Sequence, residues 1–244
     1  MNEIHTSRFK DAPWFAKEEI NTIIGGAGGI GSWLTLLLCR AGFTPVVYDF
    51  DRLEEHNLAG QMYSKQDAIS NKLKVTALKE NCKAFADTDI NIFSERITEE
   101  TMSHNYVFSA FDNMKARKDM FGAWKVFVED WKRSLETEEV EGPLIDSYKT
   151  TPIFIDGRLR AEQMQIFCVT PNNIEAYEAH LFDDTEVEDA PCTLKQTSHS
   201  AAMIASHMVA FFTNHLTNNN AKDIERNVPF LWEYFIPLDY LTVE

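Results

Sequence analysis

Residues 21–31 read NTIIGGAGGIG, and this stretch decides the fold. Its apolar start, Asn21–Gly25, is typical of a buried parallel strand, because both faces of such a strand are covered. The pattern G-x-G-x-x-G follows at once and contains one additional glycine, so that glycines stand at Gly26, Gly28, Gly29 and Gly31. These glycines let the backbone turn tightly and approach a phosphate at the amino terminus of the next helix. The stretch therefore predicts a strand, a nucleotide-binding loop and a helix.

The residues that follow supply this helix, a second strand and an acid. Ile30–Arg40 is helical in length and composition, and Gly42 ends it. Pro45–Asp49 is expected to form the second strand, which puts Asp49 where a carboxylate binds ribose hydroxyls. The arrangement indicates nucleotide binding rather than a role of the glycines in packing alone. It does not choose between NAD, FAD and ATP.

Strands and helices continue to alternate over the first half of the chain. Helical patterns cover Lys65–Ala86 and Asn113–Arg133, and strands are expected at Asp89–Phe93 and Tyr106–Ala110. Alternation of this kind implies βαβ units with right-handed crossovers, and hence a mainly parallel sheet.

The second half has a different order of elements. Two strands separated by a polar turn, Pro152–Asp156 and Gln163–Val169, come before an apolar helix at Ser198–Leu216. Asn218–Asn220 reads as a loop, and Phe230–Val243 contains one or two terminal strands. Consecutive strands without a helix between them favour antiparallel pairing on the same sheet.

These elements predict an α/β fold, with a Rossmann-like, mainly parallel sheet flanked by helices and antiparallel strands added in the C-terminal half. We expect a single domain over residues 1–244, with an acidic surface insertion at 137–142. Its nucleotide-binding βαβ core is expected at 21–117, and the C-terminal strands, crossover region and helix at 151–244.

Composition narrows the classes of partner. Lys and Arg total 23 against 38 Asp and Glu, for a formal net charge of −15 at pH 7. This charge disfavours nucleic acid and anionic membranes as partners, because both require clustered cations. The chain has no apolar run of membrane-spanning length and no apolar signal region at its N-terminus, so we expect a cytoplasmic protein. Its four cysteines lie far apart without a CxxC pair, and no zinc is expected.

A set of ordered motifs narrows the choice of nucleotide. Segment 49–78 reads DFDRLEEHNLAGQMYSKQDAISNKLKVTAL. Its acids, its Asn-Leu-x-x-Gln element and its lysine pair resemble motifs of the ThiF/MoeB/ubiquitin-activating enzyme superfamily, and they are Asp49, Asp51, Asn57, Leu58, Gln61, Lys72 and Lys74. Two further motifs match the family, in Asp112-Asn113 with Arg117, and in Arg8-Phe9 near the N-terminus. The resemblance covers roughly residues 8–216.

The resemblance implies an ATP-dependent adenylyltransferase. Such enzymes activate the C-terminal carboxylate of a ubiquitin-like or sulfur-carrier protein or of a peptide, which here must be supplied in trans, and they form homodimers. By the same resemblance, Lys74 contacts the α-phosphate, Asp112 holds Mg²⁺, and Asn57 and Gln61 contact phosphate or ribose. Arg8 is expected to reach the terminal phosphates, as an arginine that often comes from the partner subunit.

The sequence departs from the family pattern at several positions. Gly60 stands where the family has an arginine that binds phosphate, and Arg52 or Lys65 are candidates to replace it. The paired CxxC zinc knuckle of many relatives is missing, and Gln163-Met164 replaces small residues that follow the glycine matched by Gly157. A nucleotide-binding scaffold that has lost its chemistry is therefore the main alternative. A nicotinamide-dependent oxidoreductase is a third hypothesis, which the motif residues disfavour.

Cys192 has two interpretations. Its context, Ala190-Pro191-Cys192-Thr193, is similar to that of the cysteine on which ubiquitin-activating enzymes form a thioester, and Lys195 and His199 follow closely enough to lower its pKa. A small packing residue before a helix is the other interpretation. The other cysteines are expected to have no chemical role, with Cys39 and Cys168 in the core and Cys82 on an exposed helix.

Overall fold

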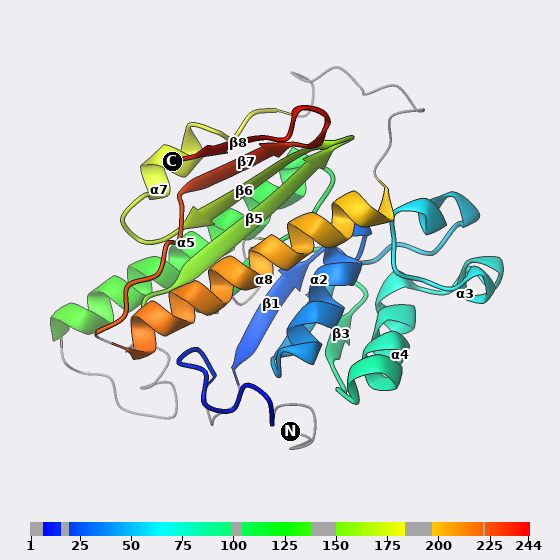
Figure 1. Cartoon of the computed structure of the whole chain (residues 1–244), viewed down its shortest axis with the longest axis horizontal. Helices are drawn as coiled ribbons and strands as arrows, with labels where there is room; N and C mark the ends of the chain where they lie inside the picture. Colours follow the sequence, from blue (N-terminus) through cyan, green and yellow to red (C-terminus); the bar gives the residue numbers. More distant parts are fainter. Residues whose placement is uncertain (1–6, 16–19, 99–103, 138–149, 184–196, 222) are drawn as a thin grey trace.

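The computed structural model describes residues 7–15, 20–98, 104–137, 150–183, 197–221 and 223–244, and these residues build one eight-stranded sheet (Figure 1). The strands lie in the order β3-β2-β1-β4-β5-β6-β7-β8. Their bounds are β1 Asn21–Gly25, β2 Thr44–Tyr48, β3 Asn91–Phe93, β4 Tyr106–Ser109, β5 Ile153–Arg160, β6 Gln163–Val169, β7 Leu231–Phe235 and β8 Tyr240–Val243.

The sheet has a parallel half and an antiparallel half that meet at β5. The five strands from β3 to β5 pair in parallel, whereas β5–β6, β6–β7 and β7–β8 pair antiparallel. Parallel neighbours need a crossover connection, which is why helices follow the early strands, and antiparallel neighbours can be joined by a tight turn. The predicted fold class is confirmed.

Helices cover both faces of the sheet (Figure 1). One face packs against α2, α4 and α8 through a core that includes Leu34, Leu78 and Phe212, and the other face packs against α5 and α7 through Trp124 and Tyr177. The helix bounds are α2 Gly29–Arg40, α3 Lys65–Ile69, α4 Lys74–Ala86, α5 Met114–Thr137, α7 Ile174–Glu178 and α8 Ser198–Asn220, with 3₁₀ turns η1 Glu55–Ala59 and η3 Ile236–Leu238. Within the described residues, no helix is both long and apolar enough to cross a bilayer.

The helical pattern at Lys65–Ala86 forms two helices rather than one. The chain leaves α3 through Asn71, whose φ of 48° is left-handed, and then runs alongside the segment that follows β2. There the Leu53 N–H donates to the Lys72 carbonyl at 2.9 Å, and Arg52 forms a β-bridge with Leu73. This pairing places Lys74 at the start of α4.

The prediction of a loop at Asn218–Asn220 is wrong, because these asparagines form the end of α8. Asn218 exchanges hydrogen bonds with the Arg226 backbone at 2.7 and 2.8 Å, and Asn220 donates to the Pro13 carbonyl at 3.2 Å. Side-chain contacts with neighbouring backbone thus hold a sequence of low helix propensity in the last turn.

Cys82 also differs from its prediction. It is fully buried in the core with α2 and α8, rather than on an exposed helix face. Cys39 and Cys168 lie in the core as expected, and burial raises the pKa of the Cys168 thiol. All three thiols are buried.

Candidate active site

A cavity of about 1260 Å³ opens at the carboxyl ends of the parallel strands. Its walls come from the residues that follow β1, β2 and β4, the usual place for a ligand in an open α/β sheet. The sequence-predicted site residues that line it are Gly26, Gly28, Gly29, Asp49, Asp51, Asn57, Gln61, Lys74 and Asp112. Of the predicted residues, Gly31 and Arg8 are described but lie outside the lining.

The cavity is less acidic than the rest of the molecule. Among the described residues, seven lysines and arginines line it against six aspartates and glutamates. The whole chain carries a net charge of −15. Cations of this lining therefore lie in the same cavity as the glycine loop, where they can attract a phosphate.

Asp49 ties the glycine loop to the end of β2. Its two carboxylate oxygens accept the Ala27 and Asp51 N–H groups, each at 2.7 Å. Burial raises the pKa of Asp49, while Lys74 and these two donors oppose the rise. Tyr63 holds the same loop from the other side, because its hydroxyl donates to the Ala27 carbonyl at 2.6 Å.

Gly26 and Gly31 serve the shape of this loop. Gly26 has a φ of 93°, which is accessible to glycine, and a Cβ atom on Gly31 would lie 1.8 Å from the Gly26 carbonyl oxygen. Gly31 therefore allows α2 to approach β1, which explains why it stays outside the cavity lining. Gly28 has open space where its Cβ would be, on the side of the cavity.

Lys74 is aimed into the cavity by Asp51. The Lys74 ammonium donates to Asp51 Oδ2 at 2.8 Å, and the Lys74 N–H donates to the Asp51 carbonyl at 2.9 Å. The lysine is 8% exposed. A cation held by one carboxylate at the edge of a cavity is pre-positioned for an anionic ligand.

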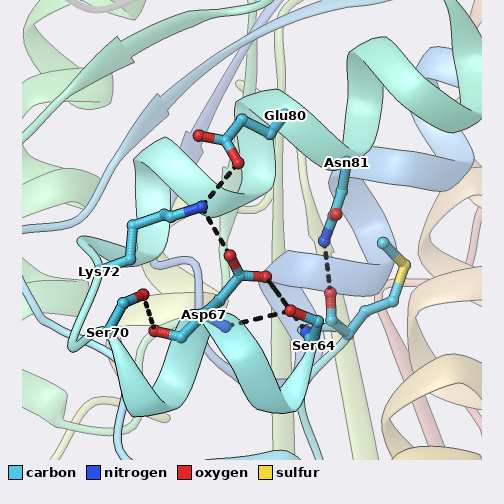
Figure 2. Close-up of polar contacts among 7 residues, drawn as sticks. Ser64, Asp67, Ser70, Lys72, Glu80 and Asn81 are labelled. Carbon is cyan, nitrogen blue, oxygen red and sulfur yellow. Dashed lines mark hydrogen bonds and ion pairs between the residues drawn. The ribbon is translucent and has the colours of Figure 1, made fainter.

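The second lysine of the predicted pair has a structural role. Figure 2 shows Lys72 between α3 and α4, where its ammonium lies 2.6 Å from Asp67 and 2.7 Å from Glu80. Asp67 also accepts the Ser64 N–H and hydroxyl in the capping box of α3 (Figure 2). Hydrogen bonds to Asp67 and Glu80 raise the pKa of Lys72. Lys72 is absent from the cavity lining, so only Lys74 of the pair can meet a ligand there.

The segment around Gly60 is fixed to the core. Gly60 is buried, and its carbonyl accepts the Trp33 indole N–H at 3.2 Å. Two residues further on, the Met62 N–H donates to the Ser32 hydroxyl at 3.1 Å, and the Met62 carbonyl accepts Asn81 Nδ2 at 2.9 Å. Gly60 does not line the cavity. Of the two candidate replacements for the family arginine, Arg52 lines the cavity and Lys65 does not.

Asn57 and Gln61 flank this segment. Asn57 Oδ1 accepts the Glu54 N–H at 3.0 Å and so shapes η1. The Gln61 side chain lines the cavity, and its buried Oε1 has no hydrogen-bond partner within the part of the chain that the structure describes. Buried polar atoms are normally satisfied, so this oxygen is suited to a donor group of a bound ligand.

Asp112 follows β4 at the start of α5. Asn113 caps this helix, because its Oδ1 accepts the Ala116 N–H at 2.9 Å, and its Nδ2 donates to Asp112 Oδ1 at 3.2 Å. Asp112 itself is exposed in the cavity. Carboxylate oxygens of this kind are the protein ligands that Mg²⁺ prefers.

A buried ion network lies behind Asp112, and the sequence reasoning missed it. Asp156 on β5 is 0% exposed, and it binds the Arg117 guanidinium, Arg158 Nε at 2.7 Å and the Tyr177 hydroxyl at 2.9 Å. Arg117 also donates to the Phe111 carbonyl, next to Asp112. Burial opposes the ionisation of Asp156, but the two arginines prevail and lower its pKa. The network thus positions the loop that carries Asp112.

The sequence contains one signal for this network. Charged residues alternate in Asp156-Gly157-Arg158-Leu159-Arg160, and this alternation puts three charged side chains on one face of the strand.

Arg8 and Cys192 stand apart from the cavity residues. The segment with Arg8 packs at the amino ends of the strands, where Trp14 contacts Phe43 with ring centroids 5.9 Å apart (Figure 1). Arg8 is exposed there and does not line the cavity of its own chain. Cys192 and most of the predicted insertion, 138–142, lie outside the described residues.

Comparison with known proteins gives the family. The model of the ThiF family matches residues 16–237. The tRNA threonylcarbamoyladenosine dehydratase of Haemophilus influenzae is 29% identical over 108 residues, which are 41% of this chain and 41% of that protein.

Solved structures give the same fold. The crystal structure of PaaA has a TM-score of 0.63 at 16% identity, and the match covers 99% of this chain and 66% of that one. Escherichia coli MccB, solved with AMPCPP and MccA, has a TM-score of 0.64 at 12% identity, with 100% and 71% covered. In the structure of MccB with ATP, this chain spans 63% of the MccB chain. At these identities the likeness concerns the fold. Because the family model matches most of its length, this chain belongs to the ThiF family.

Proposed function

We propose that this chain is an ATP-dependent adenylyltransferase that activates a C-terminal carboxylate as an acyl-adenylate. Residues 1–244 act as its single adenylation domain, and the acyl substrate is a peptide or the tail of a ubiquitin-like or sulfur-carrier protein. The observation that carries the proposal is that Lys74 and Asp112 line one cavity with the glycine loop. The relative MccB, solved with AMPCPP and MccA, supports a nucleotide and a second ligand on this fold.

The reaction joins two anions. A carboxylate oxygen of the acyl substrate attacks the α-phosphorus of ATP, the bond from this phosphorus to the bridging oxygen of pyrophosphate breaks, and pyrophosphate leaves. No proton transfer is needed, because the attacking carboxylate is already ionised. The barrier comes from charge repulsion and from orientation, so fixed cations are the main requirement.

The cavity residues meet this requirement. Lys74, oriented by Asp51, neutralises charge on the α-phosphate. This chain has Gly60 where the family has a phosphate-binding arginine. Arg52, which lines the cavity one residue after Asp51, takes over the role of that arginine. Its guanidinium is held by the Asn71 carbonyl at 2.8 Å. Asp49 binds the ribose, and Asn57 and Gln61 complete the nucleotide site.

Asp112 is the residue that fits a magnesium ion. Among the described residues, no group of three or more His, Cys, Asp or Glu could hold a metal alone. Mg²⁺ commonly binds through one or two carboxylates, phosphate oxygens and water, which matches an exposed Asp112 beside a bound nucleotide. When bound, the ion neutralises charge on the leaving pyrophosphate.

Arg8 serves the site of a second copy of the chain. In its own chain it lies at the amino ends of the strands, whereas the cavity opens at their carboxyl ends, so a contact with the phosphates requires a homodimer. Mixing Arg8→Ala with Lys74→Ala should restore activity that each variant lacks alone, because mixed dimers contain one intact site. Mixtures that stay inactive despite subunit exchange would remove Arg8 from the proposed site.

Transfer to Cys192 is the second step that we propose. The thiolate attacks the acyl carbon, a thioester forms, and AMP leaves with the electron pair of the broken C–O bond. A covalent acyl–enzyme adduct that is labile to hydroxylamine should form on the wild type and be absent from Cys192→Ser. An adduct that persists in Cys192→Ser would assign the cysteine a packing role.

The direct test is formation of acyl-adenylate. Purified protein is incubated with Mg-ATP labelled at the α-phosphate and with peptides that have free C-terminal carboxylates, and labelled acyl-AMP and pyrophosphate are measured. We expect both products in equal amounts. Binding of Mg-ATP without formation of either product would favour the alternative, a nucleotide-binding scaffold. Such a scaffold would have lost catalytic activity when Gly60 replaced the family arginine.

A further inference from the structure

The far wall of the cavity is built by the antiparallel half of the sheet. Gln163 and Gln165 lie on one face of β6, and their Nε2 atoms donate to Glu233 on β7 at 2.7 and 2.9 Å, one to each carboxylate oxygen. We name Gln163, Gln165 and Glu233 the glutamine clamp. Both glutamines line the cavity, whereas Glu233 does not and therefore lies behind them.

The carboxylate fixes the orientation of both amides. An ionised carboxylate only accepts hydrogen bonds, so each glutamine must turn its NH₂ group toward Glu233. The two carbonyl oxygens are then left as acceptors for a ligand in the cavity. Two oriented acceptors on alternate residues of one strand suit a partner with backbone N–H donors.

Arginines stand beside these acceptors in the sheet register. Arg158 pairs with Gln165 across β5 and β6, and Arg160 pairs with Gln163, so both arginines lie on the face of the glutamine clamp. Arg158 is held by Asp156 and by the His180 carbonyl at 3.0 Å, and both arginines line the cavity. The wall therefore combines amide acceptors with cations, the complement of an extended peptide that ends in a carboxylate.

The cavity has room for such a second ligand. Its volume of about 1260 Å³ exceeds the roughly 300–1000 Å³ of a typical small-molecule site. The predicted nucleotide residues occupy the glycine-loop side, and the clamp lines the β5–β6 side.

We propose that the glutamine clamp binds the backbone amide N–H groups next to the carboxylate that is activated, and so selects a peptide C-terminus over a small carboxylic acid. This inference rests on the proposed adenylyltransferase function and assigns the acyl side of its site. The chemical class it names is an extended peptide with unmodified N–H groups in its last residues.

The experiment removes the donor from the substrate and the acceptor from the protein. A pool of heptapeptides with free C-terminal carboxylates, randomised at the last three positions, is screened for acyl-AMP formation, and the best peptide is remade with an ester oxygen in place of the last backbone N–H. In the wild type we expect the ester to lower kcat/KM about fivefold, the size of one neutral hydrogen bond. In Gln165→Met, kcat/KM for the amide peptide should fall by about the same factor. Replacement of the amide by the ester should then lower kcat/KM only slightly further.

Two further variants complete the design. Glu233→Gln keeps the volume of the side chain but frees the amides to rotate, so it should raise KM for the peptide and leave KM for ATP unchanged. Gln66→Met is the matched control, because Gln66 is exposed on α3 and is not part of the cavity lining, and it should behave as the wild type.

The outcomes separate the inference from the function on which it rests. The clamp would be overturned if the ester lowered kcat/KM by the same factor in the wild type, in Gln163→Met and in Gln165→Met. It would also be overturned if acetate or free amino acids were activated as efficiently as peptides. Either result leaves adenylation in place. No acyl-AMP from any acid, with Mg-ATP binding retained, would instead overturn the proposed function.

Discussion

The two halves of the sheet contribute to the cavity in different ways. In the parallel half, the site residues follow their strands directly, in the glycine loop, at Asp49 and at Asp112. In the antiparallel half, the lining residues lie within the strands, as Gln163 and Gln165 do on β6. Parallel strands end at a common edge, where loops can surround a nucleotide, whereas an antiparallel hairpin presents its face. This difference supports the proposal that the parallel half binds the nucleotide and the antiparallel half binds the acyl substrate.

The largest expected effect concerns β5, where the halves meet. Asp156→Ala leaves two guanidinium groups without their buried carboxylate, and removing one partner of a buried ion pair costs about 3–5 kcal/mol. We expect this loss in the free energy of unfolding, measured with urea. Asp130→Ala is the control, because Asp130 pairs with Arg133 at the surface, at 3.0 Å with both side chains more than half exposed. Similar losses in both variants would contradict the account of the junction.

The same carboxylate predicts a dependence of stability on pH. The pKa of Asp156 is lowered in the folded protein, against the effect of burial, by Arg117 and Arg158. The folded state therefore gains stability above the pKa of the unfolded chain, and it loses this gain as the pH falls below about 4. Asp156→Asn should flatten this acid limb of the urea-unfolding profile. A limb of unchanged slope would assign the acid sensitivity to other carboxylates.

The next effect tests the parallel half through a matched pair of lysines. Lys74→Ala should lower the rate of acyl-AMP formation by a factor of about 10²–10³, which is the effect of removing one positioned hydrogen-bond donor from an oxyanion hole. Lys72→Ala should keep most of the activity, because Lys72 lies outside the cavity and pairs with Asp67 and Glu80 at the surface. Its cost is expected in stability, at about 1 kcal/mol or less. Inactivity of Lys72→Ala with normal folding would reverse the assignment of the pair.

A pair of glycines gives a smaller effect on the same half. Gly31→Ala brings a Cβ against the Gly26 carbonyl oxygen and should lower the free energy of unfolding by about 3 kcal/mol. Gly28→Ala meets nothing within 4 Å and should leave stability unchanged while weakening nucleotide binding at the cavity. Calorimetry of unfolding and of nucleotide titration would separate the two. Equal nucleotide affinity in Gly28→Ala and the wild type would place the phosphates elsewhere.

The smallest expected effect concerns the cation that replaces the family arginine. Arg52→Ala should lower kcat/KM for ATP about tenfold, which corresponds to about 1.4 kcal/mol of transition-state stabilisation. Lys65→Ala, outside the cavity, is the control and should have no effect. A loss confined to Lys65→Ala would reverse this choice.

The parallel half could be predicted from the sequence because its signals are local. The glycine loop, its strand and its helix occupy one continuous stretch, and Asp49 and Lys74 follow within recognisable motifs. The antiparallel half joins distant residues instead, since Gln163 and Gln165 bind a glutamate 70 and 68 positions away. No local pattern indicates such pairs.

The wrong predictions have the same cause. The core position of Cys82 depends on how α4 packs against α2, and the helical state of Asn218–Asn220 depends on backbone partners at Pro13 and Arg226. Tertiary contacts of this kind override local propensity. Asp156 was missed because its partners come from α5, β5 and α7.

Thermal unfolding of the protein with Mg-ATP, with NAD and without ligand shows which nucleotide the cavity binds. We expect stabilisation by Mg-ATP alone, by about 2.7 kcal/mol at a concentration 100 times the dissociation constant. The shift should disappear in Lys74→Ala and persist in Lys72→Ala. Stabilisation by NAD instead, or an unchanged shift in Lys74→Ala, would contradict the assignment of the cavity as an ATP site.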